Sequence, residues 1–161
     1  MTRSVGSTLP EPLYRLLDGA AVTDQAGANP TFLLVTTGAG GWPHIAMLSV
    51  GEILARGPDE LRVALWLHST TTRTLERARQ ALLAVVASPD AYYVRLSAAR
   101  LADLDLGAQG RLACFALRVE DVLQDAADYA ALTSGITFRL HQPEQVVPRW
   151  ERTIDALRAA A

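Results

Sequence analysis

Cysteine is nearly absent from this chain of 161 residues, which has only Cys114. A single cysteine cannot form an intrachain disulfide, and it excludes both a CxxC redox pair and a cysteine-rich zinc site. Cys114 lies in the apolar run 112–117, where we expect a buried, inert thiol rather than a nucleophile. The three histidines are far apart and lack the spacing of metal ligands, so we predict no metal site.

The chain also lacks an excess of positive charge and long apolar runs. Its formal net charge is −2 at pH 7, whereas a nucleic-acid-binding face would be basic. No apolar run approaches the roughly 20 residues of a membrane-spanning helix, and no cationic-then-apolar leader opens the chain. We therefore expect a cytoplasmic protein that binds neither nucleic acid nor a membrane. A small anionic ligand would need only a local basic patch.

A dinucleotide-binding glycine motif is missing as well. Residues 38–41 include three glycines, but they lead into Trp42, Pro43 and a strand pattern, whereas a GxGxxG turn opens a helix. Strand patterns do not alternate regularly with helix patterns, and no internal repeat occurs. These features disfavour a doubly wound parallel sheet.

The chain does contain a series of strand patterns, and these predict its fold. They cover residues 31–37, 44–55, 61–67, 81–88, 91–98, 111–119 and 136–140. Gly51 is expected to mark a bulge or bend. Helices are expected over 9–20, from the threonines near 70, over 121–131 and over 143–160. Residues 1–8 are expected to be flexible, 24–30 to be a loop, and 101–110 to be a loop or a short strand. The whole predicts one mainly β domain over 1–161, an antiparallel Greek-key barrel of six or seven strands with helices between strands and at the ends.

The stretch from His68 to Arg77 is the strongest candidate for function. The alternating strand over 61–67 runs into it, and Leu75, Ala78 and Leu82 follow at helical spacing. The first N–H groups of a helix lack internal partners and carry partial positive charge, so anions bind there. Further donors come from Ser69, Thr70, Thr71, Thr72, Arg73, Thr74 and Arg77. One interpretation is a phosphate pocket; the other is an ordinary helix cap, which needs a single hydroxyl.

From about Phe32 to Arg95 the chain resembles the FMN-binding split-barrel family, which includes pyridoxamine 5′-phosphate oxidase and small flavin reductases. The glycine-rich hairpin into residues 42–49, the Trp66 strand with its Ser/Thr turn, and the helix followed by an apolar strand carry the resemblance. Similar proteins often have a Lys-x-x-Asn-Leu pattern at this helix start. Here Thr71 and Thr74 occupy the lysine and asparagine positions, which leaves the positive charge to Arg73 or Arg77.

The resemblance implies a homodimeric, FMN-dependent oxidoreductase that transfers hydride through flavin N5 to or from a small molecule, with NADH or NADPH as candidate redox partners. It implies main-chain contacts to the isoalloxazine ring from Ala46, Met47, Leu48 and Ser49. It implies a phosphate site among Ser69, Thr70, Thr71, Thr72, Arg73 and Arg77. The partner's Tyr92, Tyr93 or Arg95 would help to close the pocket. No catalytic residue is assigned, because the hydride chemistry belongs to the flavin.

Alternatives remain open at this point. Without the lysine at Thr71, the same barrel could be a non-enzymatic binding protein for a flavin, haem or another planar ligand. A deazaflavin-dependent reductase would also keep this barrel. His44 is a candidate contact for the ribityl chain, although a histidine at a strand start is more often a surface or hydrogen-bonding residue. His68 is a candidate contact for the phosphate, and strand-end packing explains it at least as well. Glu52 is either an outward-facing side chain or the ion-pair partner of a nearby arginine, and we favour the ion pair.

Overall fold

The computed structural model describes residues 1–22 and 29–161, so most of the loop predicted over 24–30 lies outside the described residues. The strands are β1 Thr2–Gly6, β2 Asn29–Pro30, β3 Phe32–Thr37, β4 Pro43–Leu48, β5 Ile53–Gly57, β6 Glu60–Trp66, β7 Gln80–Ala87, β8 Asp90–Arg100, β9 Leu104–Asp105, β10 Arg111–Asp125 and β11 Thr137–Phe138. The α-helices are α1 Glu11–Leu17, α2 Thr70–Ala78 and α3 Pro143–Ala159. The strands predicted over 31–37, 61–67, 81–88 and 91–98 match β3, β6, β7 and β8 within two residues.

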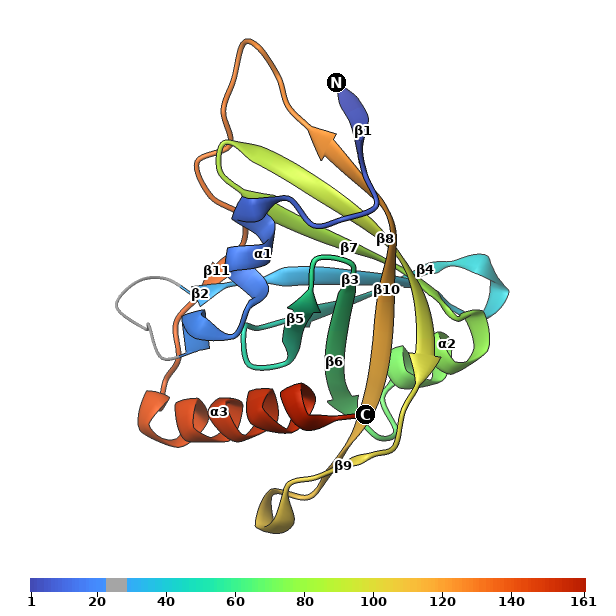
Figure 1. Ribbon diagram of the computed structural model, residues 1–161. Helices are drawn as coiled ribbons and strands as arrows, with labels where there is room; N and C mark the ends of the chain where they lie inside the picture. The colour runs from blue at the N-terminus through green and yellow to red at the C-terminus, as the bar shows by residue number, and fades with distance from the viewer. Residues whose placement is uncertain (23–28) are drawn as a thin grey trace.

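One antiparallel sheet organises the described residues (Figure 1). Its strands follow the order β4-β3-β7-β8-β10-β6-β5, and β1 and β9 pair with β10 outside this path. Every strand pair in it is antiparallel. The strands β2 and β11 form a separate pair.

The sheet must curl, because its two end strands are neighbours in the sequence. In a flat sheet, seven strands would place β4 about 29 Å from β5. Only residues 49–52 join the two, and the five peptide steps from Leu48 to Ile53 reach about 18 Å at most. No ladder joins β4 to β5 in the described residues. The result is a barrel split along this seam, which confirms the predicted fold class.

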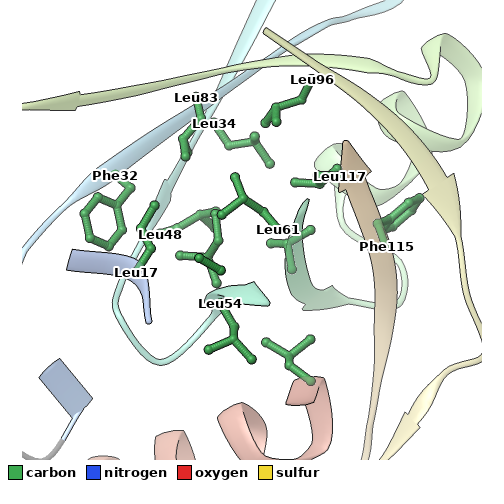
Figure 2. Close-up of a cluster of buried hydrophobic side chains, with 14 of the residues drawn as sticks. Leu17, Phe32, Leu34, Leu48, Leu54, Leu61, Leu83, Leu96, Phe115 and Leu117 are labelled. Atoms are coloured by element: carbon green, nitrogen blue, oxygen red, sulfur yellow. The ribbon is translucent and has the colours of Figure 1, made fainter. Parts of the chain in front are cut away.

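Large apolar side chains fill the inside of the curl (Figure 2). Strand β3 illustrates the alternation: Phe32 and Leu34 are buried, whereas Leu33 and Val35 are half-exposed. Each α-helix adds to the same core. The side chains drawn in Figure 2 include Leu17, Phe32, Leu34, Leu48, Leu54, Leu61, Leu83, Leu96, Phe115 and Leu117.

Helix α3 crosses the lower end of the sheet in Figure 1 and contacts β5 and β6. Pro143 opens it, as predicted, since proline suits the first helical turn. Its buried stripe includes Trp150, Ile154 and Leu157, which is the stripe that the sequence predicts. The helix therefore brings the end of the chain against the seam between the end strands.

Two of the predictions, for residues 1–8 and for residues 121–131, are wrong. Residues 1–8 are predicted to be flexible, but β1 pairs with the end of β10 through main-chain hydrogen bonds, which do not require apolar side chains. Residues 121–131 are predicted to be helical, but β10 continues through Asp125. Val122 is fully buried there and pairs with Val94 of β8, so sheet pairing determines the structure of this segment.

Two predictions around the central strands also need correction. The strand expected over 44–55 is two strands, β4 and β5, with a turn at Val50 and Gly51. Helix α2 is shorter than its apolar spacing suggests, because it ends at Ala78 and Leu82 belongs to β7. Arg79 ends the helix in the left-handed conformation, with φ 53°.

Cys114 is fully buried in β10, which confirms the inert environment expected for it. Burial in an apolar environment raises the pKa of its thiol, mainly through desolvation of the charged form. Among residues 1–22 and 29–161, no helix is long and apolar enough to span a bilayer. The same ranges contain no group of three or more His, Cys, Asp or Glu side chains placed to hold a metal ion.

Candidate functional site

A cavity of about 220 Å³ lies at the seam of the split barrel. Strands β4 and β6 and the start of α2 form one part of its wall. Helix α3, the short helix η3, Gly107–Gln109, the start of β10 and the turn between β4 and β5 form the rest. The lining residues are Ala46, Met47, Leu48, Gly51, Glu52, Ala64, Leu65, Trp66, Ser69, Thr71, Leu106, Gln109, Leu112, Arg149, Trp150 and Thr153. Segments about a hundred residues apart in the sequence thus share one small space.

The open edge of β4 contributes main-chain groups to this seam. Strand β4 pairs with β3 on one side, and in the described part of the chain no strand pairs with its other side. The N–H of Gly38 donates to the carbonyl of Trp42, which sets the alternation of the ladder. By that alternation the N–H and C=O groups of Ile45 and Met47 point away from β3. Met47 therefore offers a main-chain donor and acceptor at the cavity wall.

Three of the five hydroxyls in the Ser/Thr turn have structural roles. Ser69 is the N-cap of α2, and its Oγ accepts a hydrogen bond of 3.1 Å from the N–H of Thr72. The hydroxyl of Thr72 donates to the carbonyl of Trp66 at 2.7 Å. The hydroxyl of Thr74 lies 2.7 Å from that of Thr36 in β3. These contacts fix the helix to the sheet, so the cap interpretation holds for Ser69.

The remaining donors of the turn lie at the first residues of α2. The N–H groups of Thr70 and Thr71 have no partner within the described residues, as expected for a first helical turn. The hydroxyl of Thr71 lies 3.0 Å from Nε2 of His44 and also lines the cavity. Thr70 is exposed at the surface. The helix start therefore keeps donors that an anion could accept.

The two arginines of this region bind neutral acceptors rather than carboxylates. The guanidinium of Arg73 donates to the carbonyl of His68 at 2.7 Å and to the hydroxyl of Thr70 at 3.2 Å. That of Arg77 donates to the carbonyl of Thr37 at 2.7 Å. Neither forms an ion pair with another described residue, so their charges are not neutralised by the protein. Both are exposed beside the start of α2.

The predicted site residues divide into two groups. The cavity brings together Ala46, Met47, Leu48, Ser69 and Thr71. The other five, Ser49, Thr70, Thr72, Arg73 and Arg77, do not line it. Ser49 is buried, and its N–H and Oγ both donate to Oε2 of Glu52, at 2.7 and 2.8 Å. These hydrogen bonds replace the ion pair expected for Glu52, which forms none with the described residues.

Sequence reasoning missed the far wall of the cavity. Gln109, Arg149 and Trp150 lie far beyond the strand and turn that predict the site, and no local pattern connects them to it. The packing of Trp150 on Gly51 brings Arg149 and Trp150 there, and Gln109 lies on the connection between β9 and β10. A Cβ atom built on Gly51 would lie 1.9 Å from Cγ of Trp150. A glycine bend followed by a distant amphipathic helix is therefore the signal that could have indicated this wall.

The outside of the sheet beside the cavity is unusually apolar. Two cross-strand rows, Ile45-Val35-Leu82 and Met47-Leu33-Ala84, run over β4, β3 and β7. Ile45 is 53% exposed and Met47 is 65% exposed, whereas the outer side of an antiparallel sheet is usually polar. We call these six residues the outer apolar face. Met47 belongs both to this face and to the cavity wall.

The rows of the outer apolar face continue onto β8 at Arg95 and Tyr93. The hydroxyl of Tyr93 donates to a carboxylate oxygen of Asp125 at 3.1 Å, and this hydrogen bond is the main cause that raises the pKa of Tyr93. Tyr92 is only 6% exposed and faces the core. It therefore cannot reach a partner's pocket, which corrects one of the three residues suggested for that role.

Comparison with known sequences gives one clear relationship. No family model matches the chain. Over 146 residues it is 38% identical to YclD of Bacillus subtilis (strain 168), an uncharacterised protein, and the match covers 91% of this chain and 93% of YclD. The chain belongs to the YclD family. Its members therefore share a fold that the present structure describes.

Solved structures identify that fold independently. A candidate pyridoxamine 5′-phosphate oxidase from Lactobacillus delbrueckii matches with a TM-score of 0.55 at 16% identity, over 74% of this chain and 98% of its own. An F420 reductase matches with a TM-score of 0.53 at 12% identity, over 71% and 98%. A variant of HupZ from Group A Streptococcus matches with a TM-score of 0.52 at 16% identity, over 72% and 98%. At these identities the likeness shows the split-barrel fold and leaves the ligand open.

Proposed function

We propose that this member of the YclD family is a homodimeric flavoprotein that binds FMN in the seam cavity and transfers hydride to or from a small molecule in the cytoplasm, with NADH or NADPH as redox partner. The observation that carries the proposal is the meeting, in one cavity, of the open edge of β4 and the start of α2. The open edge of β4 suits a flat heterocycle with donors and acceptors, and the start of α2 suits an anionic tail.

Different residues of this chain would bind different parts of the cofactor. Main-chain groups of Met47 would hydrogen-bond the edge of the ring, and Ala46 and Leu48 would pack against it. The N–H groups of Thr70 and Thr71 would face the phosphate, with Arg73 and Arg77 supplying positive charge. FMN supplies the hydride chemistry when bound, so the protein needs to position it and to exclude water. His44 would orient the hydroxyl of Thr71 from a distance of 3.0 Å.

Cofactor uptake is the direct test of this proposal. The purified protein, incubated with FMN and freed of excess, is expected to retain about one FMN per chain and to show the yellow absorbance of a flavin. The bound flavin should then bleach under NADH or NADPH without oxygen. Uptake without bleaching would instead favour a non-enzymatic binding protein. Preferential uptake of the deazaflavin F420, or of haem, would overturn the choice of FMN, and uptake of none of these would overturn the proposal.

A second copy of the chain is proposed to cover the outer apolar face. Exposed apolar surface of this kind usually marks an interaction site, and because Met47 joins the face to the cavity, the second copy would also close the flavin site. The wild-type protein should therefore have twice the 17.3 kDa mass of one chain in light scattering.

A charged residue in the face should separate the copies. Ile45→Arg is expected to raise the dimer dissociation constant by about 100-fold, because an unpaired charge would be buried at the interface. The side chain is exposed in the single chain, so folding should be unaffected. Ile136→Arg is the matched control, since Ile136 is 49% exposed outside the face. A wild-type protein that is monomeric, or an Ile45→Arg variant that still dimerises normally, would rule out this interface.

A further inference from the structure

Arg149 is the one cationic side chain among the described residues that line the cavity. It lies on α3, whose position is fixed by the packing of Trp150 into the space above Gly51 and perpendicular to the Phe138 ring, with 6.2 Å between ring centroids. Arg149 is exposed on this anchored helix. The backbone of this arginine is thus placed at the wall of the cavity by a packed helix rather than by a loop.

The charge of Arg149 has no counter-ion within the part of the chain that the structure describes. None of the ion pairs there includes it, and no side-chain hydrogen bond from it is formed. Its helical neighbours at three and four residues are Gln145, Val146, Arg152 and Thr153, and none is acidic. Arg158 of the same helix, in contrast, pairs with Asp155.

The polar groups around Arg149 also lack a complete set of partners. Oε1 of Gln109 is buried and has no hydrogen-bond partner among the described residues. Glu52 lines the cavity as well, but its Oε2 accepts two hydrogen bonds from Ser49 and it makes no ion pair with Arg149. The cavity wall therefore carries one cationic and one anionic residue, Arg149 and Glu52, that do not pair with each other, beside apolar walls from Leu106, Leu112 and Trp66.

We propose that Arg149 binds the carboxylate of a small substrate whose apolar body lies against these walls. A carboxylate accepts two parallel hydrogen bonds from a guanidinium group, which fixes both the position and the orientation of the molecule. The side-chain NH2 group of Gln109 is a second donor for this carboxylate, whereas its Oε1 is an acceptor that a carboxylate cannot satisfy. The proposal rests on the proposed function in one respect, since it takes this carboxylate to be the substrate of the flavin bound in the same cavity.

Benzoate and benzamide are suitable probes, because they have nearly the same shape and only benzoate is charged at pH 7. Binding of each is measured by calorimetry and, in FMN-loaded protein, by the change in flavin absorbance. Benzoate is expected to bind at least about 10-fold more tightly than benzamide. Arg149→Gln should weaken benzoate about 10- to 50-fold and change benzamide less than about 2-fold. Arg149→Lys should retain part of the affinity for benzoate.

Arg152→Gln is the matched control, because it removes an exposed arginine from the same helix outside the cavity. It should change neither affinity by more than about 2-fold. Equal binding of the two probes to wild-type protein, absence of benzoate binding, or unchanged benzoate affinity in Arg149→Gln would overturn the proposal. A protein that takes up no flavin but binds benzoate through Arg149 in calorimetry would reject the flavin and retain the carboxylate site.

Discussion

Replacing Arg73 and Arg77 together with alanine is expected to weaken FMN binding about 100-fold and to change riboflavin binding less than about 3-fold. FMN differs from riboflavin only by its phosphate, so the comparison isolates the anion site. A charge-assisted hydrogen bond contributes about 1.5–3 kcal/mol, and surface exposure places these two at the low end. Two contributions of about 1.4 kcal/mol give a factor of 100. The loss should diminish at high salt, since exposed charges are screened.

The matched control for this experiment removes two arginines elsewhere. Arg118 and Arg139 are exposed, form no ion pair with other described residues and do not line the cavity. The double variant Arg118→Ala/Arg139→Ala changes the net charge by the same amount as the Arg73 and Arg77 variant. It should bind FMN with an affinity within about 2-fold of wild type. Equal losses for FMN and riboflavin in the Arg73 and Arg77 variant would mean that the phosphate lies elsewhere. Fluorescence quenching of the free flavin measures both affinities.

The parts of the fold that the sequence predicts are those set by local patterns. Alternation over residues 31–37 reports which face of the strand is buried, and β3 follows it, whereas β6 is buried on both faces, including Arg62 and Ala64. The start of α2 and its cap at Ser69 are also predicted from the sequence, because a helix start depends on a few neighbouring residues. For the same reason, half of the predicted site residues line the cavity.

The parts that fail depend on contacts between distant segments. The sequence 121–131 contains the spacing of a short helix, but pairing of Val122 with Val94 extends β10 instead. The polar segment 2–6 becomes a strand because the end of β10 offers an unpaired edge. Arg149 and Gln109 reach the cavity through long-range packing, which no local pattern encodes.

Gly51 connects the fold to the candidate site, and its replacement by alanine is expected to lower the free energy of unfolding by about 3 kcal/mol. The added Cβ would lie 1.9, 2.1 and 2.4 Å from three ring atoms of Trp150, far below any real contact distance. The ring is only 6% exposed and cannot move without displacing α3. Overpacking of this kind typically costs 1–3 kcal/mol or more. For a chain of this size the melting temperature should fall by roughly 5–10 °C.

Thermal and urea unfolding of four proteins would test this account: wild type, Gly51→Ala, Trp150→Leu and the double variant. Because the methyl group and the indole ring compete for one space, the double variant should lose about 1–3 kcal/mol less than the sum of the single losses. Gly57→Ala is the control, since its Cβ would meet nothing closer than 3.7 Å from a side-chain oxygen of Asp59. It should shift the melting temperature by less than about 2 °C.

The same substitution should also affect ligand binding. Helix α3 carries Arg149 and Thr153 to the cavity wall, so its displacement in Gly51→Ala should reduce both FMN affinity and benzoate affinity at temperatures where the protein remains folded. The Arg73 and Arg77 variant, in contrast, should lose FMN with little loss of stability, because those side chains are exposed and water can replace them at the carbonyls they bind. Two results would contradict this account: an unchanged melting temperature in Gly51→Ala, or losses of unfolding free energy in Gly51→Ala and Trp150→Leu that simply add in the double variant. Either would mean that the position of α3 does not depend on this contact and that other residues position the far wall of the cavity.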